Sequence, residues 1–476
     1  MKKVITYGSF DLFHKGHYQL LKRAKGLGDY LIVGVTTEHY DQMRGKLNLI
    51  DPIMTRMDNV RKTGFADEII VEDHEGQKIE DIQRYGIDVF TLGSDWDGRF
   101  DYLKEYCDVV YLPRTAGISS TDLREGKNGI VRIGMVGTGR IAARFYKETS
   151  YVSGAEVMGA YNPMKDNADA FGERYQIDIW TEDYDGFIKG VDAVYVASPN
   201  ETHSDYVRKA ILAGKHVLCE KPMTFTKKEA VELYELAKEK DVTLMEGIRT
   251  AYLPGFLQLL SVARGGAIGE ICDVEACFTR IGVPGSREMT DAEYSGAFLE
   301  YGSYTMLPII KLFGKEYDEI SIESIYGENG IDRYTRVGFR YGNRLAESKS
   351  GAGIKSEGQL IISGTEGYII AKSPWWLTRE FDVRYEDPDR VDHYDTTFSG
   401  RDGLRYEIAE FISKINGTGG VDYKLTAGES IAMAGVVEEF MKKRKAYRGA
   451  MNPKMPEDQD AARWEAVSTE RVLQDP

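Results

Sequence analysis

Short runs of apolar and β-branched residues alternate with amphipathic stretches through the first part of the chain. The runs fall at residues 3–7, 30–35, 68–71, 89–93 and 109–112. Such alternation predicts parallel strands joined by helices, because each helix covers one face of the sheet. The pattern stops near Glu125, so a first α/β domain is expected at residues 1–127.

A polar, glycine-bearing stretch at residues 124–129 precedes a second series of the same kind. Its strands are expected at residues 133–136, 156–161, 193–197, 216–219 and 243–246. From about residue 270 the β-rich runs follow one another with fewer helices between them, which is typical of an antiparallel sheet. We therefore expect a second Rossmann-like domain at 128–248, an α+β substrate and oligomerisation domain at 249–450, and an acidic tail of no assigned function at 451–476.

The size and charge of the chain favour a small-molecule enzyme over a nucleic-acid binder. With 476 residues and a formal net charge of -15, the chain lacks the basic surplus that a phosphate backbone requires. The widely spaced cysteines indicate reduced thiols and no metal site. The apolar start before the first glycine is too short for a signal peptide, and no run of about 18 apolar residues follows. A cytoplasmic protein without a membrane partner is expected.

The first glycine turn carries two histidines. Residues 8–17 read Gly-Ser-Phe-Asp-Leu-Phe-His-Lys-Gly-His, between the first strand and an amphipathic helix. A helix N-terminus offers unpaired amides and the positive end of the helix dipole, and His14 and His17, one turn apart, add donors at the same place. The two histidines could instead cap or pack the helix start, but the H-x-G-H spacing after a G-x-F-D turn favours a bound polyphosphate.

Two further motifs accompany this turn, namely Gly-Ser-Asp-Trp at 93–96 and Arg-Thr-Ala-Gly-Ile-Ser-Ser-Thr at 114–121. With them, residues 1–125 resemble the glycerol-3-phosphate cytidylyltransferase family, whose G-D-D-W and R-T-x-G-I-S-T-T motifs are altered here only at Ser94 and Ser120. H-x-G-H alone indicates the wider nucleotidyltransferase superfamily. An adenylyltransferase therefore stays open, although the 114–121 segment favours the cytidylyl branch.

The resemblance implies a set of CTP ligands. The phosphates would be bound by Gly8, Ser9, Phe10, Asp11, His14, His17, Arg114, Thr115, Ser119, Ser120 and Thr121, with Asp95 and Trp96 beside the nucleoside and Lys46 on the acceptor phosphate. Core packing is an equally open role for Trp96. The family has an arginine where Gly64 stands here, so the acceptor could differ from glycerol 3-phosphate.

The chemistry expected at this site is in-line transfer. An acceptor phosphate oxygen would attack the α-phosphorus of CTP, and pyrophosphate would leave without a covalent enzyme intermediate. Catalysis would rest on positioning and charge neutralisation by His14, His17, basic side chains and a Mg²⁺ ion carried by the triphosphate.

A second glycine turn, Gly137-Thr138-Gly139-Arg140-Ile141-Ala142, follows the 133–136 strand and opens a helix. This is the context that a dinucleotide-binding G-x-G-x-x-A requires. Ser-Pro-Asn-Glu-Thr-His at 198–203 and Glu-Lys-Pro at 220–222 follow later strands, where α/β sheets bind ligands. These motifs are similar to those of the glucose-fructose oxidoreductase and inositol dehydrogenase family, Gfo/Idh/MocA, over residues 131 to about 450.

This second resemblance implies a nicotinamide site with two catalytic residues, Lys221 and Tyr304. The cofactor ligands would be Gly137, Thr138, Gly139, Arg140, Ile141, Asn162, Lys165, Ser198, Pro199, Asn200, His203, Glu220 and Lys221. Residues 296–304 match the family's G-G-x-L-x-D-x-G-x-Y form, except that Glu300 replaces the aspartate. The Tyr304 hydroxyl would then donate a proton as hydride reaches a carbonyl carbon, although a core tyrosine on a helix face is the alternative.

The end of the second strand of this domain indicates the cofactor. Asn162 stands where a carboxylate would bind an NAD ribose, and Lys165 follows it, which favours NADP. Asp166 is also close in sequence and leaves NAD open.

The fusion predicts a bifunctional enzyme, and both resemblances imply a homo-oligomer. A ketose phosphate would be reduced to a polyol phosphate, which CTP would convert into a CDP-polyol, CDP-glycerol-like, for a cell-surface polysaccharide. The alternative is a cytidylyltransferase with an idle, nicotinamide-binding scaffold or sensor domain. Intact Lys221 and Tyr304 argue against that alternative.

Overall fold

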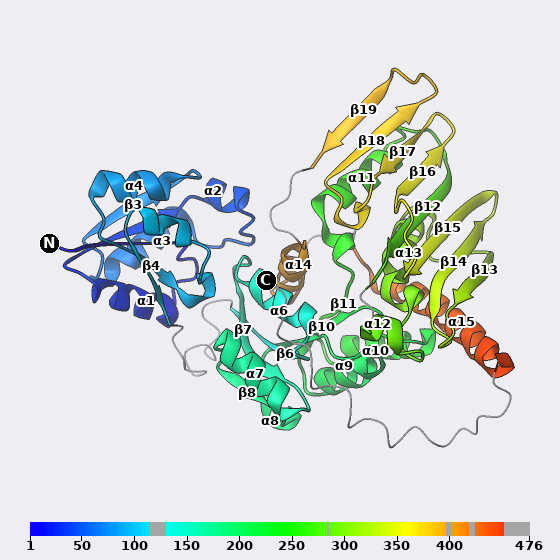
Figure 1. The fold of residues 1–476 in the computed structure, drawn as a ribbon, viewed down its shortest axis with the longest axis horizontal. Coiled ribbons are helices and arrows are strands. Elements are labelled where there is room, and N and C mark those ends of the chain that lie inside the picture. The colour runs from blue at the N-terminus through cyan, green and yellow to red at the C-terminus, as the bar shows by residue number, and fades with distance from the viewer. Residues whose placement is uncertain (114–129, 283–284, 397–401, 418–423, 452–476) are drawn as a thin grey trace.

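The computed structural model describes residues 1–113, 130–282, 285–396, 402–417 and 424–451 (Figure 1). These residues form sheets of five, six and eight strands. The two parallel sheets and the mostly antiparallel third sheet that the sequence predicts are confirmed. We call residues 1–113 the N-terminal region, 130–248 the middle region and 249–451 the C-terminal region. The expected nucleotide ligands Arg114, Thr115, Ser119, Ser120 and Thr121 lie outside the described residues, as do the 124–129 stretch and residues 452–476 of the tail.

The N-terminal region is a parallel sheet with strand order β3-β2-β1-β4-β5. Its strands are β1 (Lys3–Gly8), β2 (Tyr30–Thr36), β3 (Glu68–Glu72), β4 (Val89–Gly93) and β5 (Asp108–Leu112), and its helices are α1 (Lys15–Lys25), α2 (Glu38–Met43), α3 (Ile53–Lys62) and α4 (Gln77–Tyr85), with 3₁₀ turns η1 (Ser94–Trp96) and η2 (Asp101–Glu105). The order reverses between β1 and β4. The loops that leave these two strands therefore open at one switch point, where α/β sheets bind ligands.

The middle region is a second parallel sheet with order β11-β10-β9-β6-β7-β8. Its strands are β6 (Val131–Val136), β7 (Ala155–Tyr161), β8 (Ile179–Thr181), β9 (Ala193–Val196), β10 (His216–Glu220) and β11 (Leu244–Gly247), and its helices are α6 (Arg140–Thr149), α7 (Lys165–Tyr175), α8 (Tyr184–Lys189), α9 (His203–Leu212) and α10 (Lys227–Glu239), with η3 (Asn200–Thr202). Here the switch point lies between β6 and β9, which carry the second glycine turn and the 198–203 segment at their carboxyl ends.

The C-terminal region contains the third sheet. Its strands are β12 (Ile271–Arg280), β13 (Glu319–Tyr326), β14 (Asp332–Tyr341), β15 (Arg344–Ala352), β16 (Leu360–Gly364), β17 (Gly367–Ala371), β18 (Glu380–Tyr385) and β19 (Val391–Asp395), and its helices are α11 (Pro254–Arg264), α12 (Arg287–Thr290), α13 (Ala297–Phe313), α14 (Leu404–Ile415) and α15 (Ala427–Met451), with η4 (Arg249–Tyr252) and η5 (Trp375–Leu377). Only β12 and β15 pair in parallel among its described strands. Helix α13 packs across β12, β14 and β15.

Buried apolar side chains of the described residues form four clusters, one of which lies wholly within the middle region. Another hydrophobic cluster runs continuously from the middle into the C-terminal region, whereas the N-terminal region has clusters of its own on the two faces of its sheet. Figure 1 shows the N-terminal region in blue to one side, facing α6 and α14. Among the described residues, no helix combines the length and apolar character that crossing a bilayer requires.

Candidate functional site

The first candidate site lies at the carboxyl end of β1. Phe10 and Leu12 have left-handed backbone with φ of 51° and 46°, which is uncommon for residues other than glycine. The Phe10 side chain is buried, and a Cβ on Gly8 would lie 3.1 Å from its ring. Glycine at position 8 therefore allows the chain to turn tightly into the N-terminus of α1, where the backbone amides of the first turn have no intrahelical partner.

The two histidines of this turn form a capping box at the start of α1. His14 Nδ1 accepts a hydrogen bond from Gly16 N at 3.0 Å, and His17 Nδ1 accepts one from His14 N at 3.4 Å. A nitrogen that accepts carries no proton, so these bonds assign the proton of each neutral ring to Nε2. Burial, and then the nearby His14 and Lys46, lower the pKa of His17 well below its usual value. At neutral pH His17 is therefore an uncharged Nε2–H donor.

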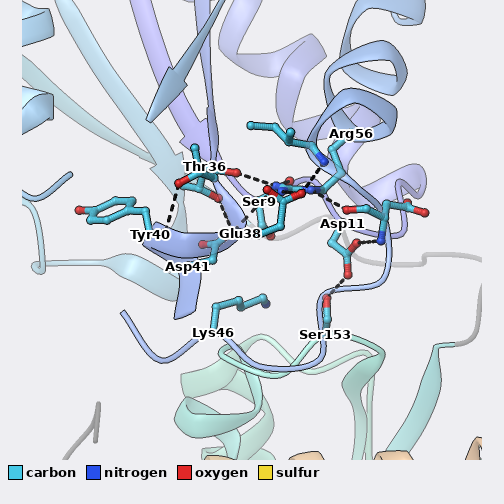
Figure 2. A network of polar contacts seen from close by, with 12 residues as sticks. Ser9, Asp11, Thr36, Glu38, Tyr40, Asp41, Lys46, Arg56 and Ser153 are labelled. Atoms are coloured by element: carbon cyan, nitrogen blue, oxygen red, sulfur yellow. Dashed lines mark hydrogen bonds and ion pairs between the residues drawn. The ribbon is translucent and has the colours of Figure 1, made fainter. Parts of the chain in front are cut away.

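Arg56 of α3, which no sequence motif marks, contacts the segments around this turn. Its side chain is fully buried and donates to the carbonyl oxygens of Ser9, Thr36 and Asp51 at 2.8, 2.8 and 2.9 Å (Figure 2). Glu38 pairs with it at 3.2 Å. One guanidinium thus joins the turn after β1, the end of β2 and the loop before α3. An arginine in an amphipathic helix looks like a solvated residue in sequence, so no local signal could have found it.

Asp11 and Lys46, both expected ligands, lie at the contact with the middle region. The Asp11 carboxylate is 5% exposed and accepts from Ile50 N and Asp51 N at 3.1 and 2.7 Å. It also accepts from the Ser153 hydroxyl (Figure 2). Lys46 Nζ donates to the Ser150 carbonyl at 2.8 Å, and burial lowers the pKa of Lys46 to about 8.

Asp95 and Trp96 follow β4 and also face the middle region. The Tyr146 hydroxyl donates to Asp95 at 3.2 Å, and the Trp96 ring meets Tyr151 edge-on with 5.7 Å between centroids. Trp96 is partly buried against the core of its own region. The structure therefore brings the β1 turn, Lys46 and the β4 turn to one edge of the sheet, beside the loop that joins α6 to β7.

The second candidate site is the glycine turn after β6. A Cβ on Gly137, whose φ is 108°, would lie 2.5 Å from the Ala197 carbonyl, so only glycine fits between β6 and β9. A Cβ on Gly139 would meet no atom within 4 Å, and this residue caps the N-terminus of α6. A close-packed first glycine and an open second one are what a pyrophosphate approaching the backbone requires. The residues present therefore fit a dinucleotide.

The other expected cofactor ligands surround this turn. Asn162 Nδ2 donates to Thr138 Oγ1 at 2.8 Å, which places an uncharged amide beside the glycine turn at the end of β7. Lys165 is exposed and bonds Asp169 at 2.6 Å, and Arg140 is exposed and pairs with Glu288 at 2.6 Å. Ile141 is partly buried against the core. The side chain that contacts the glycine turn from the end of β7 thus carries no negative charge.

His203 connects the loops that follow β9 and β10. Its two ring nitrogens lie 2.9 Å from the carbonyl oxygens of Ser198 and Pro222, and its side chain is 1% exposed. Such a buried ring holds both loops in place rather than reaching a ligand itself. Asn200, which follows Pro199 in the same loop, donates from Nδ2 to the Tyr294 carbonyl at 3.1 Å. Glu220, at the end of β10, accepts a hydrogen bond from the Tyr195 hydroxyl at 2.5 Å.

Lys221 and Tyr304 meet where the middle region joins α13. Lys221 Nζ lies 5.9 Å from the centroid of the Tyr304 ring and donates to the Glu300 carbonyl at 3.1 Å, with the Glu300 carboxylate 3.6 Å away. Burial lowers the pKa of Lys221, but Glu300, Tyr304, Glu220 and Tyr301 together outweigh it, and the net pKa is above the usual value. Burial raises the pKa of Tyr304, opposed by Arg249 and Lys221. At neutral pH the lysine is therefore charged and the tyrosine keeps its proton.

Two groups beside this pair were not found from the sequence. The Arg249 guanidinium lies 5.8 Å from the Tyr304 ring centroid, and its Nε is buried without a hydrogen-bond partner among the described residues. Glu407 of α14 is fully buried, and neither carboxylate oxygen has a partner within the described part of the chain. Burial, and then Glu220, raise the pKa of Glu407 well above its usual range. Buried polar atoms without a protein partner are uncommon, so these two groups near Tyr304 are candidates for contact with a ligand.

Comparison with known proteins gives two families. The family described as cytidylyltransferase-like matches residues 5–126, and the oxidoreductase family with NAD-binding Rossmann fold (GFO_IDH_MocA) matches residues 131–248. The glycerol-3-phosphate cytidylyltransferase of Bacillus spizizenii is 51% identical over 125 residues, which cover 26% of this chain and 96% of that protein. Both resemblances inferred from the sequence are confirmed.

The remainder of the chain has more distant relatives. The NADP(+)-dependent scyllo-inositol 2-dehydrogenase of Bacillus subtilis is 25% identical over 321 residues, which cover 66% of this chain and 97% of that protein. The crystal structure of a 3-ketoreductase from Actinomadura kijaniata, in complex with NADP and TDP-benzene, aligns with a TM-score of 0.56 and 22% identity, covering 65% of this chain and 96% of that one. At this identity the alignment shows a shared fold.

Proposed function

The chain belongs to the glycerol-3-phosphate cytidylyltransferase family through residues 5–126 and carries the NAD-binding fold of the Gfo/Idh/MocA oxidoreductases, and on this premise we propose that it makes a CDP-polyol in two steps. A ketose phosphate is reduced with NADPH to a polyol phosphate. CTP then converts the polyol phosphate into a CDP-polyol and pyrophosphate. The observation that carries this proposal is the presence, in one chain, of an H-x-G-H phosphate turn and a charged lysine beside a protonated tyrosine.

In the transfer step the protein positions phosphates. The Nε2–H groups of His14 and His17 donate to phosphate oxygens of CTP, and the first amides of α1 add to them. Lys46 neutralises the acceptor phosphate, whose oxygen attacks the α-phosphorus. Asp11 holds the loop that carries Lys46 through the amides of Ile50 and Asp51. Mg²⁺ would neutralise the triphosphate.

In the redox step the nicotinamide supplies hydride. The Tyr304 hydroxyl donates its proton to the carbonyl oxygen of the substrate, and the Lys221 ammonium stabilises the negative charge that develops there. Arg249 adds a second cation beside Tyr304 and suits an anionic substrate such as a ketose phosphate. Asn162 at the end of β7 admits the 2′-phosphate of NADPH because it offers no charge that would repel it.

Two separate panels test this proposal. Purified protein with Mg²⁺ is given each of the four nucleoside triphosphates with glycerol and pentitol phosphates, and pyrophosphate is measured. It is then given NADPH with triose and pentulose phosphates, and nicotinamide absorbance is followed. We expect CTP-specific pyrophosphate release and NADPH oxidation with at least one ketose phosphate. ATP specificity would favour an adenylyltransferase, and no nicotinamide turnover with any ketose phosphate would favour a scaffold role for the second half.

A further inference from the structure

The loop that follows α2 pairs with a segment of the middle region by backbone hydrogen bonds. Leu47 N donates to the Tyr151 carbonyl at 2.8 Å, and Ser153 N donates to the Leu47 carbonyl at 2.9 Å. Leu47 and Val152 thereby form a parallel β-bridge. We call residues 150–153, which join α6 to β7, the bridging segment. It fixes the position of the loop at 44–51 by main-chain contacts that do not depend on side-chain identity.

The bridging segment also contacts two side chains of the first candidate site. Its Ser153 hydroxyl donates to the Asp11 carboxylate (Figure 2), and its Ser150 carbonyl accepts a hydrogen bond from Lys46 Nζ at 2.8 Å. Ser153 is 6% exposed and Asp11 5% exposed. A buried carboxylate needs donors from the protein, and the hydroxyl of Ser153 supplies one that the N-terminal region does not.

A buried arginine strengthens the same contact. Arg405 of α14 donates to the carbonyl oxygens of Arg44 and Gly45 at 3.2 Å each. Its Nε and Nη2 also donate to the carboxylate of Glu148, near the end of α6, at 2.7 and 3.1 Å. The Arg405 guanidinium also lies 3.7 Å from the centroid of the Tyr151 ring. The loop that carries Lys46 is therefore held at its start by the C-terminal region and at its centre by the bridging segment.

We propose that Ser153 of the oxidoreductase half is a positioning residue for cytidylyl transfer, because its hydroxyl orients the Asp11 carboxylate and, through the amides of Ile50 and Asp51, the loop that presents Lys46 to the acceptor phosphate. This inference rests on the proposed role of the β1 turn and Lys46 in the transferase reaction. It means that the transferase site is completed by residues from outside the region that resembles the cytidylyltransferases.

The test compares single hydroxyl deletions in the full-length protein. Ser153→Ala removes the donor to Asp11. Ser150→Ala is the matched control, since the Ser150 hydroxyl donates to the Lys147 carbonyl at 2.8 Å and only its backbone contacts Lys46. For each variant, kcat and KM for CTP and polyol phosphate, NADPH oxidation and the thermal midpoint are measured. Binding of polyol phosphate and of CTP is measured by calorimetry.

We expect Ser153→Ala to raise the KM for polyol phosphate or lower kcat of transfer by about tenfold, the effect of one hydrogen bond to a charged group. NADPH oxidation and Ser150→Ala kinetics should match the wild type. Ser153→Thr, which keeps the hydroxyl, should recover most of the loss, whereas a general packing defect would not be rescued in this way. If Ser153→Ala does not fold, Ser153→Cys, which keeps the volume but donates weakly, should show the same selective loss.

Wild-type transfer kinetics in Ser153→Ala would overturn the proposal, as would equal loss of both activities with a lowered thermal midpoint and no recovery in Ser153→Thr. The proposed function fails separately, if the wild-type protein forms no CDP product from any polyol phosphate. In that case the calorimetric comparison still decides the inference, because misplacement of the loop that carries Lys46 predicts weaker polyol-phosphate binding in Ser153→Ala than in Ser150→Ala.

Discussion

The imidazole rings of His14 and His17 stack with 4.0 Å between their centroids, and each turns Nδ1 towards a backbone N–H of the same helix start. This arrangement fixes the tautomers without any ligand. Both rings are therefore oriented as Nε2–H donors before CTP binds, which is the preorganisation that electrostatic catalysis requires.

Replacing His17 by alanine should abolish most CDP-polyol formation and leave reduction unchanged. Loss of one oriented donor lowers the rate about 10²–10³-fold, and the nicotinamide turn belongs to another sheet. Pyrophosphate release and NADPH absorbance measure the two activities. His39→Ala, at an exposed position on α2, is the control. Loss of both activities in a folded His17 variant would contradict two separate sites.

The affinity for polyol phosphate should fall as pH rises through 8. The pKa of Lys46 is lowered to about 8, so its ammonium is present below that pH and is lost above it. The acceptor phosphate stays fully ionised over this range, since its second pKa is about 6. We expect KM to rise about tenfold between pH 7 and pH 9. Lys46→Arg should remove the rise, because arginine stays charged; a flat wild-type profile would exclude Lys46 as the acceptor ligand.

Tyr304→Phe should lower nicotinamide turnover about 10²–10⁴-fold, the usual contribution of a general acid, without changing cytidylyl transfer. Because the pKa of Tyr304 is raised, the wild-type reduction should also show no loss from tyrosine ionisation up to about pH 9. Tyr301→Phe is the matched control, since Tyr301 lies on the same helix and stacks on Phe278 at 4.4 Å. Wild-type rates in Tyr304→Phe would assign the proton to Lys221 or a water.

The cofactor preference should depend on the charge at position 162. Asn162→Asp keeps the shape of the side chain and places a carboxylate beside the glycine turn, where it repels a 2′-phosphate and can bind a ribose. The ratio of kcat/KM for NADPH to that for NADH should fall at least about tenfold. Asn167→Asp, which adds the same charge on α7, should change it little. A wild-type preference for NADH would refute the NADP assignment.

The fold and the two glycine turns could be predicted because their signals are local. Apolar runs bounded by turns predict the strands. A glycine turn between a strand and a helix predicts a phosphate-binding turn at the carboxyl edge of a parallel sheet. Gly137, for example, is required by a contact at the end of β9, which neighbours β6 in the sheet but follows it only after β7 and β8 in the sequence, and it still carries a recognisable local motif.

Other residues of the sites have no such signal. Ser153 and Asp11 are separated by 142 positions, and Lys46 and Ser150 by 104. Arg56 and Glu407 are charged residues in amphipathic helices, where a buried face and a solvated face look alike until the packing partner is known. Contacts between regions are set by tertiary packing, so the completion of one site by another part of the chain could not be inferred from motif spacing.

The central claim is that both halves act on one carbon skeleton, and hydride labelling tests it most directly. NADPH carrying deuterium on the transferred face of C4 is incubated with the full-length protein, Mg²⁺, CTP and a ketose phosphate, and the product is analysed by mass spectrometry. We predict a CDP-polyol one mass unit heavier than the product made with unlabelled NADPH, formed together with pyrophosphate and lost in Tyr304→Phe. A CDP-product without deuterium, or NADPH oxidation that never leads to a cytidylylated product, would contradict the account.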